Sequence, residues 1–168
     1  MRVETREKIE TKTGNIDIPS FGGDWGGLMP HRPPYIMVDK LTYFDLKTAK
    51  TVFTICADTF FCFDGVMEEA GLVENIAQTC AARTGYKQRI WQDDVAIIDN
   101  EKAKIGVIAM IQSMEIQRCP VFGETLETKI DIEEEIFSII FVRSEVKVGD
   151  ETIATCRMKL FLTDKIPE

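Results

Sequence analysis

The chain has 168 residues, of which 45% are hydrophobic and 29% charged, and its formal net charge is -8 at pH 7. This length predicts one domain, residues 1–168, that buries about 70% of its unfolded surface, with residues 1–13 as a polar N-terminal arm. The negative charge argues against nucleic acid or an anionic membrane surface as a partner, and no apolar run is long enough to span a bilayer.

Two strands are predicted before the first long helix. Residues 34–45 ("PYIMVDKLTYFD") and 50–57 ("KTVFTICA") are rich in β-branched and aromatic side chains, which pack well on a pleated sheet.

A helix is predicted for residues 66–87. Apolar or small side chains recur at spacings of three and four and form one stripe: Val66, Ala70, Val73, Ala77, Cys80 and Thr84. Asp64 is placed to cap the start of this helix.

Period-two patterns predict the remaining elements as strands over residues 104–117, 126–136, 142–148 and 154–162, with a turn at residues 149–151. The last two strands form a hairpin around that turn. The order of elements predicts an α+β architecture, in which an antiparallel sheet wraps around one long central helix.

The cysteines and the N-terminus predict a cytoplasmic protein. Five scattered cysteines without a CxxC pair suit reduced thiols and give no metal spacing, and the charged start "MRVETREKIETK" contains no secretory signal. The sequence therefore predicts neither a metal nor a cofactor.

Three stretches carry motifs that occur together. "LMPHRPPYIMVDKL" (28–41) contains a Pro-His-Arg-x-Pro run, "GLVENIAQTCA" (71–81) contains a glutamate followed by Ala-Gln, and "CPVFGETLETKIDI" (119–132) contains a Phe-Gly-Glu turn before a strand. In this order they resemble bacterial 3-hydroxyacyl-(acyl carrier protein) dehydratases, over most of the chain. The resemblance implies a hotdog fold and a hydro-lyase of fatty-acid or polyene-type biosynthesis, acting on 3-hydroxyacyl thioesters of acyl carrier protein or coenzyme A.

One segment departs from that family. Its members usually carry Gly-His-Phe-Pro-Gly ahead of the central helix, with the histidine as catalytic base, whereas this chain has "FFCFDGV" (60–66) there. The resemblance therefore implies a catalytic position for Glu74 and leaves the base unassigned, because His31 matches the histidine of the first motif. Aryl-polyene-type dehydratases resemble that motif and vary the later segment.

His31 and Glu74 are the first candidates for acid–base chemistry. His31 is the only histidine, and imidazole is the side chain that titrates nearest neutrality. Glu74 has small and polar helix neighbours, including Ala77 and Gln78, beside which a thin acyl tunnel could run, so Gln78 is also a candidate for substrate binding. Either residue could instead be structural: His31 bonded to nearby backbone, or Glu74 solvated on the outer helix face.

Other residues are candidates on weaker grounds. Asp64 lies where the family has its base, although it could be only a helix cap. The N–H groups of Gly65 and Val66 could polarise a thioester carbonyl at the helix N-terminus. Arg32, with other scattered cations, could meet an acidic carrier protein; these cations are Arg83, Lys87, Arg89 and Arg118.

Three functions remain open at this stage. The first is a dehydratase that uses His31 and Glu74; the second is a hotdog thioesterase in which Asp64 or Glu74 activates water; the third is a non-catalytic acyl-binding subunit. The first is favoured by the combined motifs. Because a sheet around one helix leaves open strand edges, at least a homodimer is predicted.

Overall fold

The strands in the C-terminal half follow the predicted alternation closely. The computed structural model describes residues 13–19, 28–92 and 105–163. In β7 (Thr125–Ile136) the side chains of Leu126, Thr128, Ile130 and Ile132 are buried, and those between them are more exposed. Strands β8 (Ile139–Val148) and β9 (Glu151–Thr163) alternate in the same way and form the predicted hairpin.

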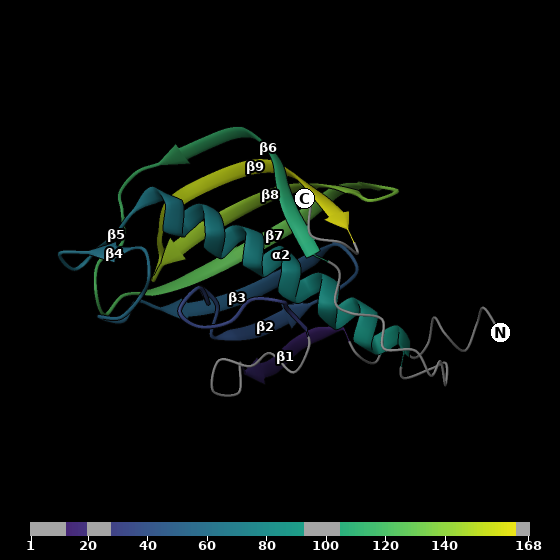
Figure 1. The fold of residues 1–168 in the computed structure, drawn as a ribbon, viewed down its shortest axis with the longest axis horizontal. Helices are drawn as coiled ribbons and strands as arrows, with labels where there is room; N and C mark the ends of the chain where they lie inside the picture. The colour runs from purple at the N-terminus through teal and green to yellow at the C-terminus, as the bar shows by residue number, and fades with distance from the viewer. Residues whose placement is uncertain (1–12, 20–27, 93–104, 164–168) are drawn as a thin grey trace.

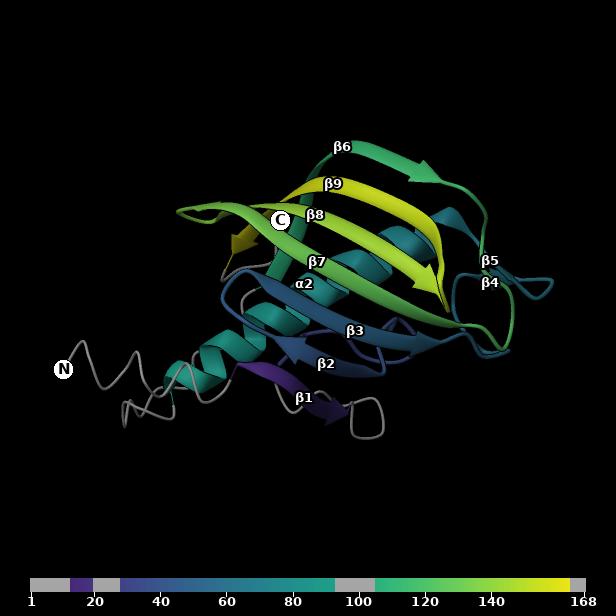
Figure 2. The same cartoon turned by 180° about the vertical axis from the view of Figure 1, so that it is seen from behind.

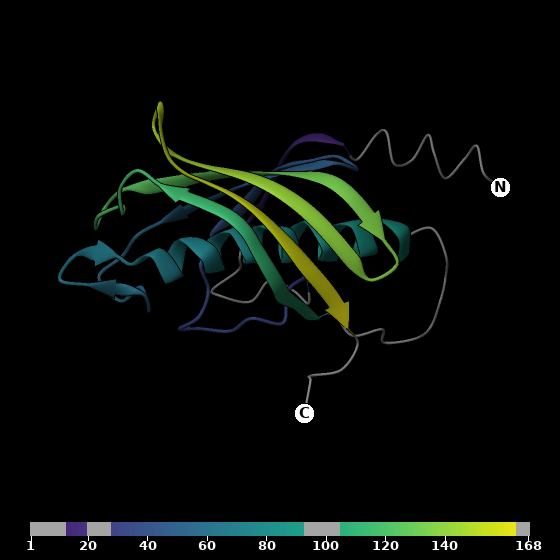
Figure 3. The ribbon, with the colours of Figure 1, turned by 90° about the horizontal axis from the view of Figure 1, so that it is seen from above.

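These strands belong to one antiparallel sheet of seven strands in the order β1-β2-β3-β7-β8-β9-β6. The other members are β1 (Gly14–Pro19), β2 (Lys40–Phe44), β3 (Thr48–Thr54) and β6 (Ile105–Ile116). The sheet curves around α2 (Glu69–Gln92), which lies along its inner face (Figures 1 and 3). The predicted α+β architecture of a sheet wrapped on one helix is confirmed. The assignment of residues 1–168 to one domain stays a prediction.

The two ends of the sheet differ. From behind, strands β3, β7, β8 and β9 cover the helix, while β1 and β6 form the two edges (Figure 2). β1 was not predicted, because its six residues include Asn, Asp and Pro, all weak strand formers. The predicted polar arm lies outside the described residues except for Thr13. In the described part of the chain, no helix is long and apolar enough to cross a membrane.

The prediction of a strand from residue 34 was wrong. Hydrogen bonding to β3 begins only at Asp39, whose N–H donates to the carbonyl of Val52. Before that point the backbone is bound by helix side chains. Gln78 Oε1 accepts from the N–H of Met37 over 2.8 Å, and Asn75 Nδ2 donates to the Met37 carbonyl over 2.6 Å. The segment therefore lies along α2 rather than beside another strand.

The predicted helix start was also wrong. Residues before Glu69 form a two-stranded hairpin of β4 (Cys62–Phe63) and β5 (Val66–Met67). Asp64 and Gly65 make its turn with φ values of 50° and 78°, the left-handed conformation that such two-residue turns need. Asp64 is thus a turn residue of the hairpin and does not cap the helix.

The face of α2 that packs on β3 and β7 is not the predicted apolar stripe. The helix buries Leu72 and Ile76 in the core, and next to them Asn75 and Thr79 bond to the sheet. Thr128 donates to Asn75 Oδ1, and the hydroxyls of Thr79 and Thr51 lie 2.7 Å apart. These bonds satisfy polar groups that would otherwise be costly to bury. Of the predicted stripe, Val66 lies outside the helix and Ala70 is exposed, whereas Ala77, Cys80 and Thr84 line a cavity between the helix and the β6 end of the sheet.

Gly85 gives a first test of how the segment that carries His31 is held. A Cβ at Gly85 would lie 1.9 Å from the carbonyl oxygen of Leu28, so only glycine permits this contact. Replacing a helical glycine with alanine usually stabilises a helix by about 0.5 to 1 kcal/mol. Here we expect Gly85→Ala to lower the free energy of unfolding by about 1 to 3 kcal/mol, because backbone must move. Urea unfolding checks it, and a more stable variant would contradict the contact.

Candidate active site

His31 and Glu74 come together in the fold. His31 Nε2 lies 3.4 Å from Glu74 Oε1, and the two side chains are 25% and 28% exposed. Both can therefore meet a bound molecule while remaining largely shielded from water. The structure places side by side the two residues that the sequence predicts for acid–base chemistry.

The loop that carries His31 is held by Arg32. The guanidinium of Arg32 donates to the carbonyl of Met29 over 3.1 Å and to that of His31 over 2.8 Å. Met29 itself is fully buried beside α2. The predicted role of Arg32 toward a carrier protein stays a prediction. In this structure its side chain hydrogen-bonds to the backbone of its own loop.

Gln78 orients Glu74. Its Nε2 donates to Glu74 Oε1 over 2.7 Å and to the carbonyl of Tyr35 over 2.6 Å, while its Oε1 accepts from Met37. The side chain is fully buried. An amide held at both ends restricts the carboxylate to one position, so the geometry favours a supporting role for Gln78 over direct contact with a substrate.

A cavity of about 360 Å³ adjoins this pair. One wall is the open face of α2, formed by Glu74, Ala77, Cys80, Ala81 and Thr84. The other wall is the β6 end of the sheet: Gly106, Ile108, Ile140, Leu160 and Leu162 lie on its inner face, and Val107 also borders the cavity. His31 and Glu74 are its charged or titratable members apart from the Cys80 thiol, so an apolar ligand would meet acid–base groups within one cavity.

The environment sets the protonation of two lining residues. Burial lowers the pKa of His31 below its usual 6.5, partly opposed by the Glu74 carboxylate and reinforced by Arg32, so the ring is neutral at pH 7. The Nδ1 atom of His31 is buried without a hydrogen-bond partner among the described residues. Burial also raises the pKa of Cys80 to about 12, which leaves a neutral thiol with little nucleophilic character.

Asp64, Gly65 and Val66 lie elsewhere. All three are exposed in the β4–β5 hairpin, and none lines the cavity of His31 and Glu74. The N–H groups of Gly65 and Val66 were predicted as donors at a helix N-terminus, and that reason is wrong because α2 begins at Glu69. Their roles toward substrate remain untested.

The cations predicted to meet a carrier are mostly engaged. Arg83 is 1% exposed and donates to the carbonyl of Leu46, so the idea that it meets a partner at the surface was wrong. Lys87 Nζ lies 3.1 Å from Glu135 Oε2. The side chain of Arg89 lies outside what the structure describes.

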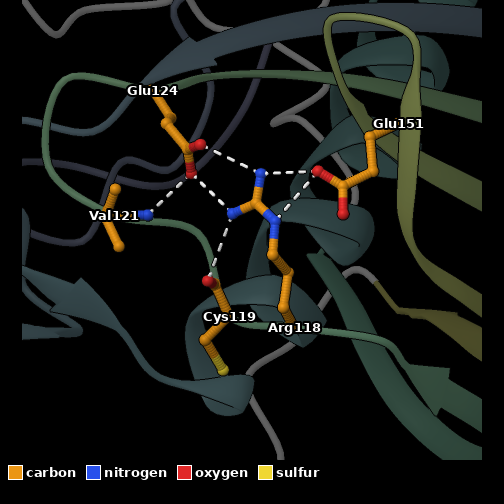
Figure 4. Close-up of polar contacts among 5 residues, drawn as sticks. All are labelled: Arg118, Cys119, Val121, Glu124 and Glu151. Carbon is orange, nitrogen blue, oxygen red and sulfur yellow. Dashed lines mark hydrogen bonds and ion pairs between the residues drawn. The ribbon is translucent and has the colours of Figure 1, made fainter.

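Arg118 has a structural task (Figure 4). Its guanidinium donates to both oxygens of Glu124, over 2.8 and 2.9 Å, and to Glu151 over 2.9 Å. Glu124 also accepts the N–H of Val121, and these bonds hold the pKa of the Glu124 carboxyl below its usual range. The next residue, Phe122, donates its N–H to the carbonyl of Gly65. This network thus holds the turn that supports the β4–β5 hairpin.

The sequence analysis did not identify the sheet wall of the cavity. Ile108, Leu160 and Ile140 lie in one row across β6, β9 and β8, and Gly106 pairs with Leu162 in the next row. The period-two patterns predict inward side chains on each strand, but only the pairing of strands shows which of them share a wall.

Comparison with known proteins gives one family for this chain. Residues 24–168 match the ApeP-like family, described as ApeP dehydratase. A 3-hydroxyacyl-[acyl-carrier-protein] dehydratase FabZ of Clostridioides difficile is 26% identical over 145 residues, which cover 82% of this chain and 94% of that protein.

Solved structures show the same fold. The dehydratase heterocomplex ApeI:P of Xenorhabdus doucetiae contains a chain that matches with a TM-score of 0.74 at 14% identity, covering 83% of this chain and 91% of that one. The HP0420 homologue of Helicobacter felis matches with a TM-score of 0.59 at 12% identity, covering 84% and 90%. At these identities the likeness confirms the hotdog fold.

Proposed function

Because the chain belongs to the ApeP-like dehydratase family, we propose that it removes water from 3-hydroxyacyl thioesters carried by acyl carrier protein, with His31 as the base and Glu74 as the acid. The observation that carries this assignment is the 3.4 Å contact between His31 Nε2 and Glu74 Oε1 on the wall of one apolar cavity. His31 is then the base, although the loop ahead of α2 contains no histidine.

The two groups can divide the reaction between them. Neutral His31 accepts the proton from C2 of the substrate, and the electron pair forms the C2–C3 double bond as the C3–oxygen bond breaks. In the reactive form of the pair Glu74 carries one proton, and it gives that proton to the departing hydroxyl, which leaves as water. His31 is then protonated and Glu74 ionised. A proton transfer from Nε2 to Oε1 restores both groups for the next turnover.

The direct test separates loss of water from release of thiol. The protein is incubated with 3-hydroxyacyl thioesters and with saturated acyl thioesters, on acyl carrier protein and on coenzyme A. We expect enoyl thioester from the first set and no free thiol from the second. Thiol release from saturated substrates would instead identify a thioesterase, and neither product would favour an acyl-binding subunit.

The lowered pKa of His31 predicts the pH dependence. A base must be neutral to accept a proton, so kcat/KM should rise with pH through an apparent pKa below 6.5. The same shift acts on stability, because the unfolded chain binds a proton at this residue before the folded protein does. Stability should therefore fall as pH falls below 6.5 and toward the folded value. A pH–rate profile with an acid limb above pH 7 would exclude His31 as the base.

We also propose that the protein acts in the cytoplasm as a dimer or larger assembly. All five cysteines are free, as a reducing compartment would keep them. β6 is a 12-residue strand at one end of the sheet order, with Met110 51% and Ile111 43% exposed. Such an edge is suited to pairing with a second subunit. Light scattering at micromolar concentration should report at least a dimer; a monomer would count against it.

A further inference from the structure

Gly106 differs from every other glycine in the described part of the chain. Four of them have positive φ, which favours glycine: Gly14, Gly65, Gly123 and Gly149. At Gly71 and Gly85 a Cβ would lie within 3 Å of neighbouring atoms. At Gly106 the φ is not positive, and among the described residues a Cβ would meet only Leu162 Cδ2, at an ordinary 3.8 Å.

Neither backbone conformation nor packing against the described residues therefore explains Gly106. It lies within β6. Glycine weakens a strand because it loses more backbone conformational entropy on folding than other residues and has no side chain to pack. An added Cβ would fit without moving the described neighbours, and a residue with a side chain would favour the strand more than glycine does. Glycine inside a strand otherwise marks the close approach of a ligand or of another backbone.

The position of Gly106 indicates a ligand. Gly106 lines the cavity of His31 and Glu74, and the beginning of β6 lies beside the second half of α2, whereas Glu74 is in the first half (Figures 1 and 3). The facing helix wall consists of small side chains, Ala77, Ala81 and Thr84. The hydroxyl of Thr84 already donates to the Cys80 carbonyl, so it does not attract a polar group.

The cavity length sets a scale for the ligand. Glu74 and Thr84 are ten residues apart on α2, or about 15 Å at 1.5 Å per residue. An extended carbon chain advances about 1.25 Å per atom, given bonds of roughly 1.5 Å at near-tetrahedral angles. That distance corresponds to a chain of about 12 carbons.

We infer that Gly106 determines acyl-chain length, by leaving open the distal part of the cavity so that an unbranched apolar chain of up to about 12 carbons can pass between β6 and α2. This inference rests on the proposed function for the identity of the ligand as an acyl thioester. The wall near Gly106 then acts on chain length alone, because His31 and Glu74 at the other part of the cavity meet the thioester and the hydroxyl.

The test is Gly106→Val, with Gly106→Ala as an intermediate and Thr155→Ile as the control. Thr155 is exposed on the neighbouring strand β9 and does not line the cavity. Binding of saturated acyl-coenzyme A of 4 to 14 carbons, as probes, is measured by calorimetry, and dehydration is measured with 3-hydroxyacyl thioesters of the same lengths. Binding without turnover keeps the result separate from the proposed reaction.

We expect wild-type affinity to rise about fourfold per methylene and to level off near 12 carbons. In Gly106→Val the plateau should come about three carbons earlier, with roughly 60-fold weaker binding of the longest probes and unchanged binding of the shortest. The variant should unfold at an equal or higher urea concentration. Gly106→Ala should shift the plateau by about one carbon, and Thr155→Ile should not shift it.

Two results would overturn the inference. One is an equal loss of affinity at every chain length in a folded Gly106→Val protein. The other is a change of oligomeric state on light scattering with the length profile unchanged, which would assign the space to a second subunit. If wild-type protein shows the length profile but forms no enoyl product, the dehydratase proposal fails and the role of Gly106 stands.

Discussion

Glu74→Gln should lower kcat by at least about 100-fold while leaving the fold intact. Glutamine has the same shape, and its carbonyl oxygen can still accept from Gln78 Nε2, which lies 2.7 Å from Glu74 Oε1 in the native protein. What it lacks is the acidic proton for the departing hydroxyl. Turnover of 3-hydroxyacyl thioesters and urea unfolding, measured on the same preparation, separate the lost proton from a lost structure.

Glu69→Gln is the matched control. Glu69 is an exposed glutamate in the first turn of the same helix and does not line the cavity. This variant loses one negative charge from α2 without touching the site, so its kcat should stay within about twofold of wild type. Wild-type turnover in Glu74→Gln would end the catalytic role of Glu74 and leave it a partly shielded neighbour of His31.

His31→Ala should reduce dehydration by about 10² to 10⁴, the range of a lost general base. The side chain is partly exposed, and its polar contact among the described residues is the one to Glu74, at 3.4 Å, so little stability should be lost with it. The remaining activity should also lose the acid limb of the pH–rate profile, because the group with the lowered pKa is gone. If His31 is structural, the variant should instead lose about 1 to 3 kcal/mol of stability and keep its activity.

Asp64→Asn tests whether the catalytic base is the Asp64 carboxylate or the His31 imidazole. Asparagine tolerates the left-handed conformation that Asp64 adopts, with φ of 50°, so the hairpin turn should be kept. We expect near wild-type dehydration, because Asp64 is exposed and outside the cavity. An inactive Asp64→Asn beside an active His31→Ala would reverse the assignment and favour a thioesterase that uses a carboxylate.

The sequence by itself determined the sheet strands of the second half and the presence of one long helix. Alternation in β7, β8 and β9 reflects a sheet with one face on the core. The polarity of each side chain therefore indicates which face of the sheet it lies on. The helix face on β3 and β7 was not predicted, because it carries Asn75 and Thr79, which hydropathy counts as polar although Thr128 and Thr51 satisfy them. The apolar stripe therefore faces the cavity instead.

The residues at which β2 and α2 begin depended on tertiary contacts that the sequence pattern does not contain. Residues 34–39 look like a strand, but Gln78 and Asn75 bind their backbone and keep them out of the sheet. Asp64 looks like a helix cap, but its positive φ places it in a hairpin turn. In both cases hydrogen bonds to distant residues override a local preference.

The sequence also named His31 and Glu74 separately, through residue chemistry and motif resemblance. Only the tertiary structure decided that they touch, because Leu28 packs on Gly85 and Gln78 joins Tyr35 to Glu74, which bring the loop against the helix. The sheet wall of the cavity likewise depends on the pairing of β6 with β9 and of β9 with β8. Its residues are Gly106, Ile108, Ile140, Leu160 and Leu162. Strand order comes from long-range pairing, and a single sequence holds no direct signal for it.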